Sequence, residues 1–197
     1  MPKIFTDEER EALRIKLMER GFELLKTQGY KRIRIEALAL DCYIAKGTFY
    51  AFFESKSEFL HQIMLYERQR AKDALLTYTD EDGKLSAKGL YQYLRWLFDE
   101  NPNVFAYLTP SEQQYFLNEW PSGYIEHEDT DHATMNMLCH MLRKPRTDAR
   151  RECACNLMKM GAAALTVPNL FLHNAWDETL DLLTQQIVAC LTEQEID

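Results

Sequence analysis

The sequence predicts an all-α protein, and three observations support that prediction. The chain has 197 residues but only 7 Gly and 6 Pro, so turn-forming residues are scarce. Its apolar residues recur at intervals of three and four along most of the chain, which is typical of amphipathic helices, and no segment alternates like a β-strand. With 46% hydrophobic and 27% charged residues, the composition excludes a disordered or fibrous chain.

The first predicted helix carries Leu13, Leu17, Gly21 and Leu24 along one side. Acidic residues at positions 7–9 favour its N-terminus, because they complement the positive end of the helix dipole. Gly29 ends this helix.

Two short helices follow. Apolar residues at i, i+3, i+4 and i+7 predict one helix over 35–42, and a third helix begins at Lys46 and can bury Phe49, Phe52 and Phe53. Two short helices that are joined by a tight turn and braced by an earlier helix are the elements of a helix-turn-helix.

The rest of the chain also predicts helices, which gives about nine in all. Ser55 and Glu58 predict a capping box for a long fourth helix that is broken by residues 80–83. Further helices are expected over 85–99, in two segments punctuated by Pro102, Pro110 and Pro121, over 130–142, from Thr147 or Asp148 towards Leu172 with a kink at Pro168, and over 176–191.

The net charge of -8 is unevenly distributed. Residues 1–60 carry 11 Lys and Arg against 10 Asp and Glu, whereas the remaining residues carry 12 against 21. Between residues 20 and 56 the balance is 7 basic to 4 acidic. This local excess of positive charge predicts that the N-terminal part meets a polyanion, and a chance fluctuation in surface charge is the alternative.

Composition also bears on the compartment. No stretch approaches the ~18 uncharged apolar residues of a membrane span, and the acidic start of the chain differs from a signal peptide. We therefore expect a cytoplasmic protein with no membrane partner. Five scattered Cys, an odd number, predict reduced thiols rather than a disulfide framework.

A fixed spacing connects several residues around the helix-turn-helix, namely Gly29-Tyr30, Ile35, Leu38-Ala39 and the run Ile44-Ala45-Lys46-Gly47-Thr48-Phe49-Tyr50-Ala51-Phe52-Phe53-Glu54-Ser55-Lys56-Ser57-Glu58-Phe59-Leu60. This pattern resembles the N-terminal signature of TetR-type transcription regulators. The resemblance implies a three-helix DNA-binding domain over 1–56 and a helical effector-binding and dimerisation domain over 57–197.

Carried over residue by residue, the resemblance implies two kinds of DNA contact. Contacts to the phosphate backbone are expected from Lys46, Thr48, Tyr50 and Lys56, and positions near base edges are expected for Ala45, Gly47 and Ala51. Because Ala51 cannot form a bidentate hydrogen bond to a base, Lys46, Tyr43, Arg34 and the shape of the groove are further candidates for sequence choice.

Three departures from the family pattern remove local stabilisers. Ile33-Arg34 replaces the Thr pair that opens the second helix, Tyr43 replaces the turn glycine, and Ala45 replaces the capping Ser. A missing N-cap costs ~1 kcal/mol, and a non-Gly residue in a left-handed turn costs up to ~1–2 kcal/mol. We expect a turn that is looser, or built differently, until DNA binds.

The central and C-terminal residues supply candidates for an effector site and a dimer interface. Aromatic and Met side chains between Trp96 and Phe171 form either an ordinary core or an apolar pocket, and the candidate effector contacts are Trp96, Phe105, Tyr107, Tyr115, Phe116, Met137, Met141 and Phe171. A heptad-like seam over 176–191 and a run of small residues at 161–164 predict an interface between protomers, with candidates Leu157, Gly161, Ala164, Leu180, Leu183, Ile187 and Leu191. Plain helix propensity is the alternative reading of the small residues.

No metal or cofactor is expected. His132 and His140 lie eight residues apart, about two helical turns, and the acidic residues around them fit a solvated loop better than a metal site. The chain has no nucleophile elbow, phosphate loop or zinc-protease motif, so an enzyme is not expected.

Together these observations predict a sequence-specific DNA-binding transcription regulator. The expected form is a homodimeric repressor that binds a double-stranded, inverted-repeat operator and is released by a small-molecule effector. The alternative is a protein-binding adaptor that has kept the helix-turn-helix and lost DNA binding.

Overall fold

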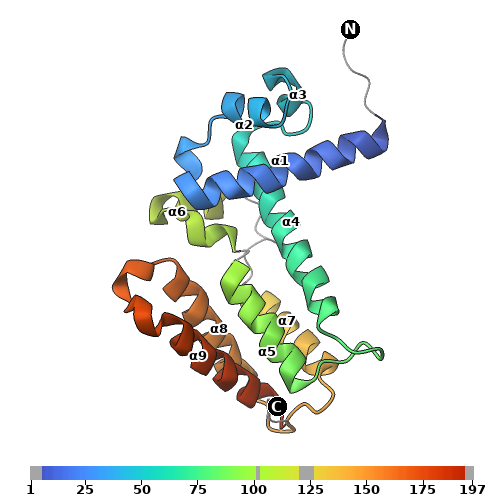
Figure 1. Cartoon of the computed structure of the whole chain (residues 1–197), viewed down its shortest axis with the longest axis vertical. Helices are drawn as coiled ribbons and strands as arrows, with labels where there is room; N and C mark the ends of the chain where they lie inside the picture. The colour runs from blue at the N-terminus through green and yellow to red at the C-terminus, as the bar shows by residue number, and fades with distance from the viewer. Residues whose placement is uncertain (1–5, 101–102, 120–126, 194–197) are drawn as a thin grey trace. The chain divides into compact units, whose positions relative to one another are not determined.

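The computed structural model describes residues 6–100, 103–119 and 127–193, and these residues form nine α-helices and no β-sheet (Figure 1). The all-α prediction is therefore confirmed. The helices are α1 (Asp7–Gln28), α2 (Ile35–Asp41), α3 (Lys46–Tyr50), α4 (Lys56–Thr77), α5 (Ala87–Glu100), α6 (Pro110–Glu119), α7 (His127–Met141), α8 (Arg151–Leu165) and α9 (Trp176–Leu191). Short 3-10 turns lie at Tyr30–Arg32, Val104–Tyr107, Pro168–Leu170 and His173–Ala175.

The chain divides into two compact units. Among the described residues, unit 1 holds 6–69 and 103–119, and unit 2 holds 70–100 and 127–193. The single helix α4 contributes residues to both units. The predicted division of function between residues 56 and 57 stays a prediction.

Unit 1 is built around α1. Thr6 Oγ1 accepts from the Glu9 N–H at 3.2 Å, and the Glu9 carboxylate accepts from the Thr6 N–H at 3.0 Å, so a capping box begins the helix. At the other end, Gly29 has φ 78° and its N–H donates to the Leu25 carbonyl at 3.0 Å. The left-handed region is open to glycine without strain, which explains why the helix ends there.

The core of unit 1 joins α1 to α2, α3 and α4 through side chains that are almost fully buried, namely Leu17, Met18, Phe22, Leu25, Leu38, Phe49, Phe53, Phe59 and Ile63. Helix α1 approaches α4 so closely that a Cβ on Gly21 would lie 2.4 Å from Phe59 Cζ. As predicted, Ser55 Oγ accepts from the Glu58 N–H at 3.0 Å, but the Glu58 carboxylate returns to the N–H of Glu54 rather than to that of Ser55.

Unit 2 has a helical core to which α5, α7, α8 and α9 contribute. Fully buried members include Leu90, Leu94, Leu138, Ala154, Ile187 and Leu191. Gly161 lies where α8 meets α5 and α9, and a Cβ there would lie 2.5 Å from Phe98 Cε1 and 2.9 Å from Leu183 Cδ2. All five Cys are free thiols.

The turn between α4 and α5 is bonded to the end of α7, an arrangement that we call the α4–α7 clamp. The Leu85 N–H donates to the Met141 carbonyl at 2.8 Å, and the Arg143 N–H donates to the Leu85 carbonyl at 2.9 Å. The Arg143 guanidinium pairs with both Asp80 and Asp82. The turn and the end of α7 are thus joined through backbone and side chains.

Two predictions about α8 are wrong. The helix ends at Leu165 instead of continuing through a kink at Pro168, which opens a separate 3-10 turn. Proline has no N–H to donate and disfavours helical backbone in the residue before it. At the other end the N-cap is Arg150, and Asp148 pairs with Arg146 instead of capping the helix.

None of the helices in the described ranges is both long and apolar enough to cross a membrane.

Candidate nucleic-acid interface

The helix-turn-helix places α3 through a tight turn after α2. The Ile44 N–H donates to the Ala39 carbonyl at 2.9 Å, and the Tyr43 N–H donates to the Leu40 carbonyl at 2.9 Å. Tyr43 has φ 63° and is the non-glycine residue with positive φ in the described chain. Tyr43 thus takes the left-handed conformation of the glycine that it replaces, at a cost of ~1–2 kcal/mol, so the turn is not built differently. Its loosening in the absence of DNA stays a prediction.

Helix α3 has two contrasting faces. Phe49 and Phe53 are buried and pack edge to face on Phe59, with ring centroids 5.1 and 4.7 Å apart. Phe52 is half-buried beneath the Arg10 guanidinium, 5.2 Å from the ring centroid. This aromatic anchoring fixes a helix of five residues that could not hold itself in place.

The opposite face of α3 is open. Lys46, Gly47, Tyr50 and Ala51 are exposed, and Ala45 is exposed just before them, whereas Thr48 is half-buried. A Cβ added to Gly47 would meet no atom within 4 Å. Nothing within the folded chain therefore requires a glycine there.

Both short helices begin without a side-chain cap. Arg34 is the N-cap of α2 and Ala45 the N-cap of α3, and neither side chain bonds a backbone N–H. Each missing cap costs ~1 kcal/mol. The predicted loss of these stabilisers is confirmed, and Arg34 is left exposed at the start of α2.

Lys46 is held by a carboxylate from α2. Its ammonium pairs with Glu36, and both side chains are at least half exposed. The hydrogen bond to Lys46 lowers the pKa of Glu36, and the same bond raises the pKa of Lys46. Any phosphate that binds Lys46 must compete with Glu36.

Lys56 lies in a more enclosed setting than the other candidates. Its ammonium is 4.2 Å from the centroid of the Tyr30 ring and donates to the Lys31 carbonyl at 3.5 Å. Burial lowers the pKa of Lys56, and it raises the pKa of Tyr30 to about 12. The ammonium therefore connects the start of α4 to the Tyr30 turn. These contacts do not require a phosphate, and they are compatible with one.

Two large side chains, Tyr43 and Leu40, are exposed at the end of α2 and in the turn that follows it. Tyr43 is 89% exposed, with the Lys16 ammonium 5.1 Å from its ring centroid, and Leu40 is 74% exposed. Lys16, Leu40 and Glu36 were not among the predicted site residues. The helical spacing of α2 places Leu40 outside the buried stripe of Ile35, Leu38 and Ala39, and this spacing could have predicted that Leu40 is exposed.

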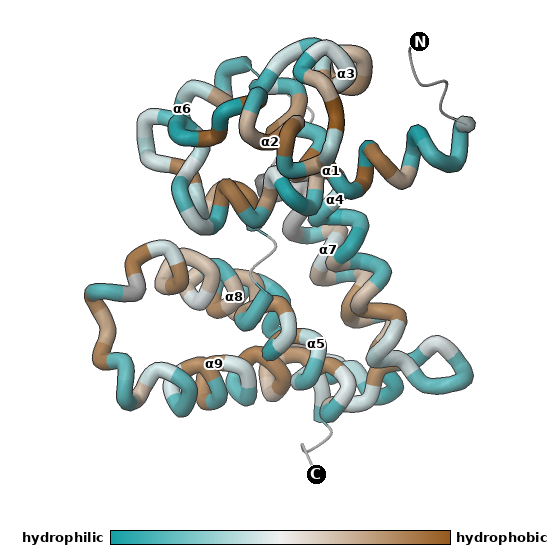
Figure 2. The backbone as a smooth tube through the Cα atoms, turned by 45° about the horizontal axis from the view of Figure 1, so that its top comes forward, coloured by the Kyte–Doolittle hydropathy of each residue, from teal (hydrophilic) through white to brown (hydrophobic). Residues whose placement is uncertain are grey.

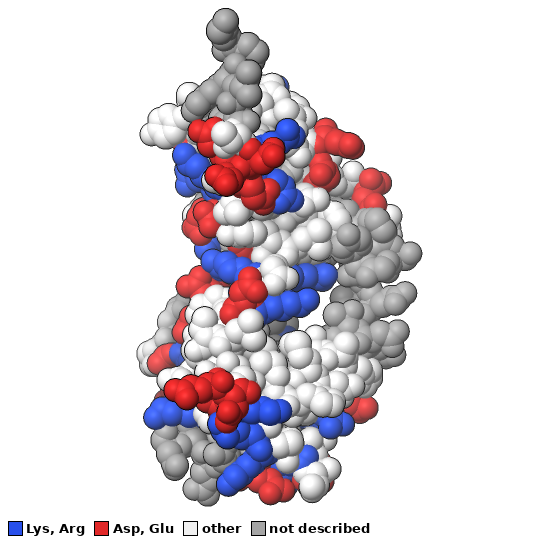
Figure 3. Space-filling view, turned by 90° about the vertical axis from the view of Figure 1, so that its right-hand side faces the viewer, with Lys and Arg blue, Asp and Glu red and all other residues white. Residues whose placement is uncertain are grey.

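The described residues form no uninterrupted basic patch on the face drawn in Figure 3. On the face drawn in Figure 3, Lys and Arg side chains lie beside Asp and Glu side chains. Arg20 pairs with Asp41 in this manner at 2.7 Å. On this face, the acidic side chains offset part of the attraction that the Lys and Arg side chains would exert on a polyanion.

The structure does not bring the eight predicted effector residues together. Four belong to unit 1 and four to unit 2, namely Phe105, Tyr107, Tyr115 and Phe116 in the first and Trp96, Met137, Met141 and Phe171 in the second. In unit 1 the aromatic rings pack as core. Phe116 is fully buried, and its ring centroid lies 4.9 Å from that of Tyr30. The ring centroids of Tyr107 and Phe22 lie 5.7 Å apart.

The unit 2 members are also spread out. Trp96 stacks on Tyr93 at 6.2 Å, Phe171 packs against Trp176 at 4.8 Å, and Met137 is 39% exposed. Met141 packs against the unit 2 core.

Part of the predicted dimer seam is buried inside the protomer, and the interface stays a prediction. Leu180, Ile187 and Leu191 are buried inside the protomer, and Gly161 closes the contact of α8 with Phe98 and Leu183. The heptad-like pattern of α9 is thus the pattern of a helix packed on its own unit. Leu157 and Leu183 are half-buried against the same core, and Ala164 is half-buried.

A metal site does not emerge from the described side chains, among which no three His, Cys, Asp or Glu are grouped to hold an ion. The acidic run at 127–131 contributes backbone to α7, and its side chains lie outside the described set.

Residues 17–63 match the family model of bacterial regulatory proteins, tetR family. The search of curated proteins gives no match. The matched segment covers the buried half of α1, the whole helix-turn-helix and the start of α4.

Solved structures share the fold over nearly the whole chain. A putative TetR-family transcriptional regulator from Vibrio parahaemolyticus is 16% identical with a TM-score of 0.60, covering 92% of this chain and 100% of its own. A TetR-family transcriptional regulator from Haemophilus influenzae RD is 16% identical with a TM-score of 0.59, covering 93% and 98%.

The superantigen PfiT is also similar, at 16% identity and a TM-score of 0.57, covering 96% of this chain and 100% of its own. Residues 17–63 therefore match the N-terminal model of this family, and the chain as a whole shares the fold of solved TetR-family structures, in agreement with the predicted resemblance.

Proposed function

We propose that the chain is a homodimeric repressor that binds an inverted-repeat operator through α3 and leaves it when a small molecule binds unit 2. The observation that carries the proposal is the two-faced structure of α3. One face is fixed by buried Phe49 and Phe53, and the other presents small and polar residues that the chain's own packing does not use.

The exposed face of α3 fits DNA chemically. Lys46 supplies a cation and Tyr50 a hydroxyl donor for phosphates, while Gly47 and Ala51 leave room for base edges to approach. Arg34, exposed at the start of α2, is placed to reach the adjacent backbone or a base edge. These side chains would bind one half-site.

A dimer is proposed because two-fold operators mirror two-fold proteins. The α9 seam is not the candidate dimer surface, because Leu180, Ile187 and Leu191 are buried within the protomer. Large exposed apolar side chains instead lie on α8, on α9 and in the connection between these helices, where Figure 2 shows hydrophobic segments, and they are Met160, Val167, Leu170, Leu172 and Leu182. Apolar exposure of this extent favours a protein contact.

Release of DNA is proposed to run through α4. This helix begins at Lys56, directly after the helix-turn-helix, and ends near the α4–α7 clamp in unit 2. A ligand that displaces α4 would change the separation of the two α3 helices. Because both must enter major grooves ~34–36 Å apart, a shift of a few Å loses one half-site.

The test is selection of a random duplex library by the purified protein at ~0.15 M salt, followed by sequencing of the enriched pool. We expect an inverted repeat. With that repeat as probe, Lys46→Ala together with Tyr50→Ala should weaken binding ~10–100-fold and reduce the salt dependence by about one phosphate contact. Lys88→Ala, an exposed lysine on α5, is the matched control and should leave affinity unchanged.

A bound effector would itself prevent DNA binding, so the selection is repeated with protein that has been unfolded and refolded to remove small molecules. Failure of both preparations to enrich any sequence, at this salt and at lower salt, would contradict the proposal. An unchanged affinity of the double variant would instead reject α3 as the reading helix.

A protein-binding role is the second candidate. The exposed side chain of Leu40 favours it, because an aliphatic side chain on a DNA-facing turn has no group that can hydrogen-bond a phosphate. The similar fold of the superantigen PfiT supports the idea that this architecture serves more than one purpose. The library selection separates the two roles.

A further inference from the structure

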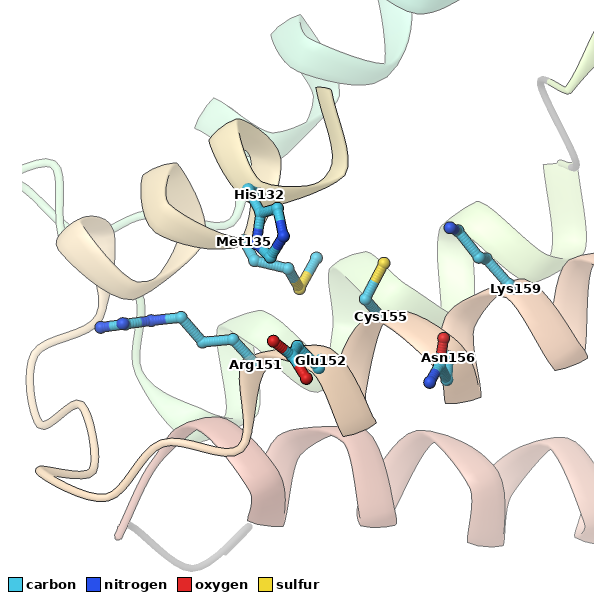
Figure 4. A pocket seen from close by; sticks show the side chains of 7 residues that line it. All are labelled: His132, Met135, Arg151, Glu152, Cys155, Asn156 and Lys159. Carbon is cyan, nitrogen blue, oxygen red and sulfur yellow. The ribbon is translucent and has the colours of Figure 1, made fainter. Parts of the chain in front are cut away.

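A groove between α7 and α8 is lined by residues that none of the sequence patterns identified. Its larger part encloses about 450 Å³ and is lined by His132, Met135, Arg151, Glu152, Cys155, Asn156 and Lys159. Its volume falls in the range of small-molecule sites. Figure 4 shows His132 and Met135 reaching from α7, Cys155 reaching up from α8, and Arg151 and Lys159 at opposite ends.

The groove continues along α8 into an apolar part of about 200 Å³. The two parts share Met135, Cys155 and Lys159, and the apolar part adds Met158 and Ala162. These α8 positions fall at intervals of three and four, so they form one stripe of the helix. Met side chains adapt readily to apolar bodies of different shape.

Among the described residues that line the polar part, Arg151 and Lys159 bring two cations and Glu152 one carboxylate. Arg151 Nε donates to the thiol of Cys139 at 3.4 Å, and no carboxylate from the described residues pairs with this guanidinium. Its terminal nitrogens thus retain the fork that binds a carboxylate in two hydrogen bonds.

The start of α8 strengthens this preference for an anion. Arg150 is the N-cap and Arg151 the first residue, so two cations stand at the positive end of the helix dipole and no side chain caps it. Glu152 compensates only one of these charges. A ligand carboxylate bound beside Arg151 would relieve the remaining unfavourable interaction.

We propose that this groove binds an organic monoanion with an apolar tail, the carboxylate at Arg151 and the tail along Met135, Met158 and Ala162. The inference rests on the proposed function, since it names the chemical class of the effector. It differs from the sequence prediction, because none of the predicted effector residues lines the groove.

The test is calorimetric titration of the full-length protein with decanoate, in parallel with decan-1-ol and with acetate. Decanoate should bind with a Kd of roughly 10–100 μM, a value reasonable for a ligand of its size. Decanol lacks the charge and acetate lacks the tail, so each should bind at least tenfold more weakly.

Two variants test the two ends of the groove. Arg151→Gln should weaken decanoate at least tenfold, as expected for loss of a charge-assisted hydrogen bond. Lys88→Gln, which removes an exposed cation of α5 outside the lining, should change affinity less than twofold. Ala162→Phe, which fills the apolar part and leaves Arg151 intact, should also weaken decanoate at least tenfold. Circular dichroism checks that each variant is folded.

Equal effects of Arg151→Gln and Lys88→Gln, equal binding of decanol, or no binding of decanoate would each overturn the proposal. The titration contains no DNA, so failure of operator binding would not affect its result. If the protein selects an operator and decanoate does not bind, the regulator proposal stands and the groove assignment falls.

Discussion

Two glycines on different parts of the molecule meet opposite surroundings. Gly161 in α8 is enclosed, since an added Cβ would lie 2.5 Å from Phe98 Cε1 and 2.9 Å from Leu183 Cδ2. Gly47 in α3 is open, since an added Cβ would meet no atom within 4 Å. The first glycine is required by the folded chain, and the second is not.

This difference distinguishes internal from external demands on a sequence. A glycine inside a helix costs roughly 0.5–1 kcal/mol relative to alanine. At Gly161 that cost is offset by the close packing of α8 on α5 and α9. At Gly47 no contact within the chain offsets it, so a partner that approaches α3 closely is the remaining reason, in keeping with the proposed DNA interface.

The largest expected effect comes from filling the closed position. Gly161→Val should lower the free energy of unfolding by ~3 kcal/mol, because overpacking forces Phe98 and Leu183 to move. The thermal midpoint should fall by ~6–12 °C in a melt followed by circular dichroism. Ala163→Val, on the exposed side of the same helix, should change it by less than ~2 °C. Equal shifts would mean that α8 is not packed as described.

Filling the open position should separate binding from stability. Gly47→Ala should raise the free energy of unfolding by up to ~1 kcal/mol, and its methyl group should weaken operator binding about tenfold, which corresponds to ~1.4 kcal/mol. Fluorescence anisotropy with the selected duplex measures the second effect.

Ala45→Ser is the control for this variant. It should supply the missing N-cap and stabilise the fold by ~1 kcal/mol without adding bulk at position 47. If both variants strengthened binding, stability alone would govern affinity and the close approach at Gly47 would be refuted.

A smaller gain is expected from releasing Lys46. Glu36→Gln removes the carboxylate that competes with phosphate, and affinity for the operator should rise about threefold with a steeper salt dependence. The exposed pair contributes little to folding, so stability should hardly change.

The pH dependence follows from the pKa directions. The pKa of Glu36 is lowered and that of Lys46 is raised, so stability from this pair is lost only when acid protonates Glu36 or strong base deprotonates Lys46. Neither group titrates between about pH 6 and pH 8. The gain should therefore be the same at both values, and Glu54→Gln, an exposed acid just after α3, should not reproduce it.

The smallest effect is expected at the turn. Tyr43→Gly should relieve the left-handed backbone at φ 63°, but it also loses the contact with Lys16 and gives the unfolded chain more freedom. The net change in unfolding free energy should be a gain of no more than ~1 kcal/mol in a urea titration. A clear loss of stability would show that the contacts of Tyr43 stabilise the fold by more than its left-handed backbone costs.

Much of unit 1 could be predicted because its structure is local. The stripe of α1, the stop at Gly29, the uncapped start at Ala45 and the left-handed Tyr43 all follow from residues close together in sequence. The buried face of α3 could also be predicted, because Phe49 and Phe53 follow helical spacing.

Unit 2 was harder to predict because periodicity shows that a helix buries one face without showing what covers it. The seam of α9 fits a partner and the protomer's own core equally well in sequence, and burial of Leu180 and Ile187 decides for the core. The groove residues Arg151 and His132 come from different helices and share no pattern, so only the packing of α7 on α8 brings them together.

The α4–α7 clamp has a consequence for how unit 2 moves. Leu85 both donates to Met141 and accepts from Arg143, so the two backbone bonds share one residue. Neither the α4–α5 turn nor the end of α7 can separate from the other without breaking both bonds and the pairs of Arg143 with Asp80 and Asp82. The two segments therefore form one cooperative opening unit, in which solvent gains access to both at the same moment.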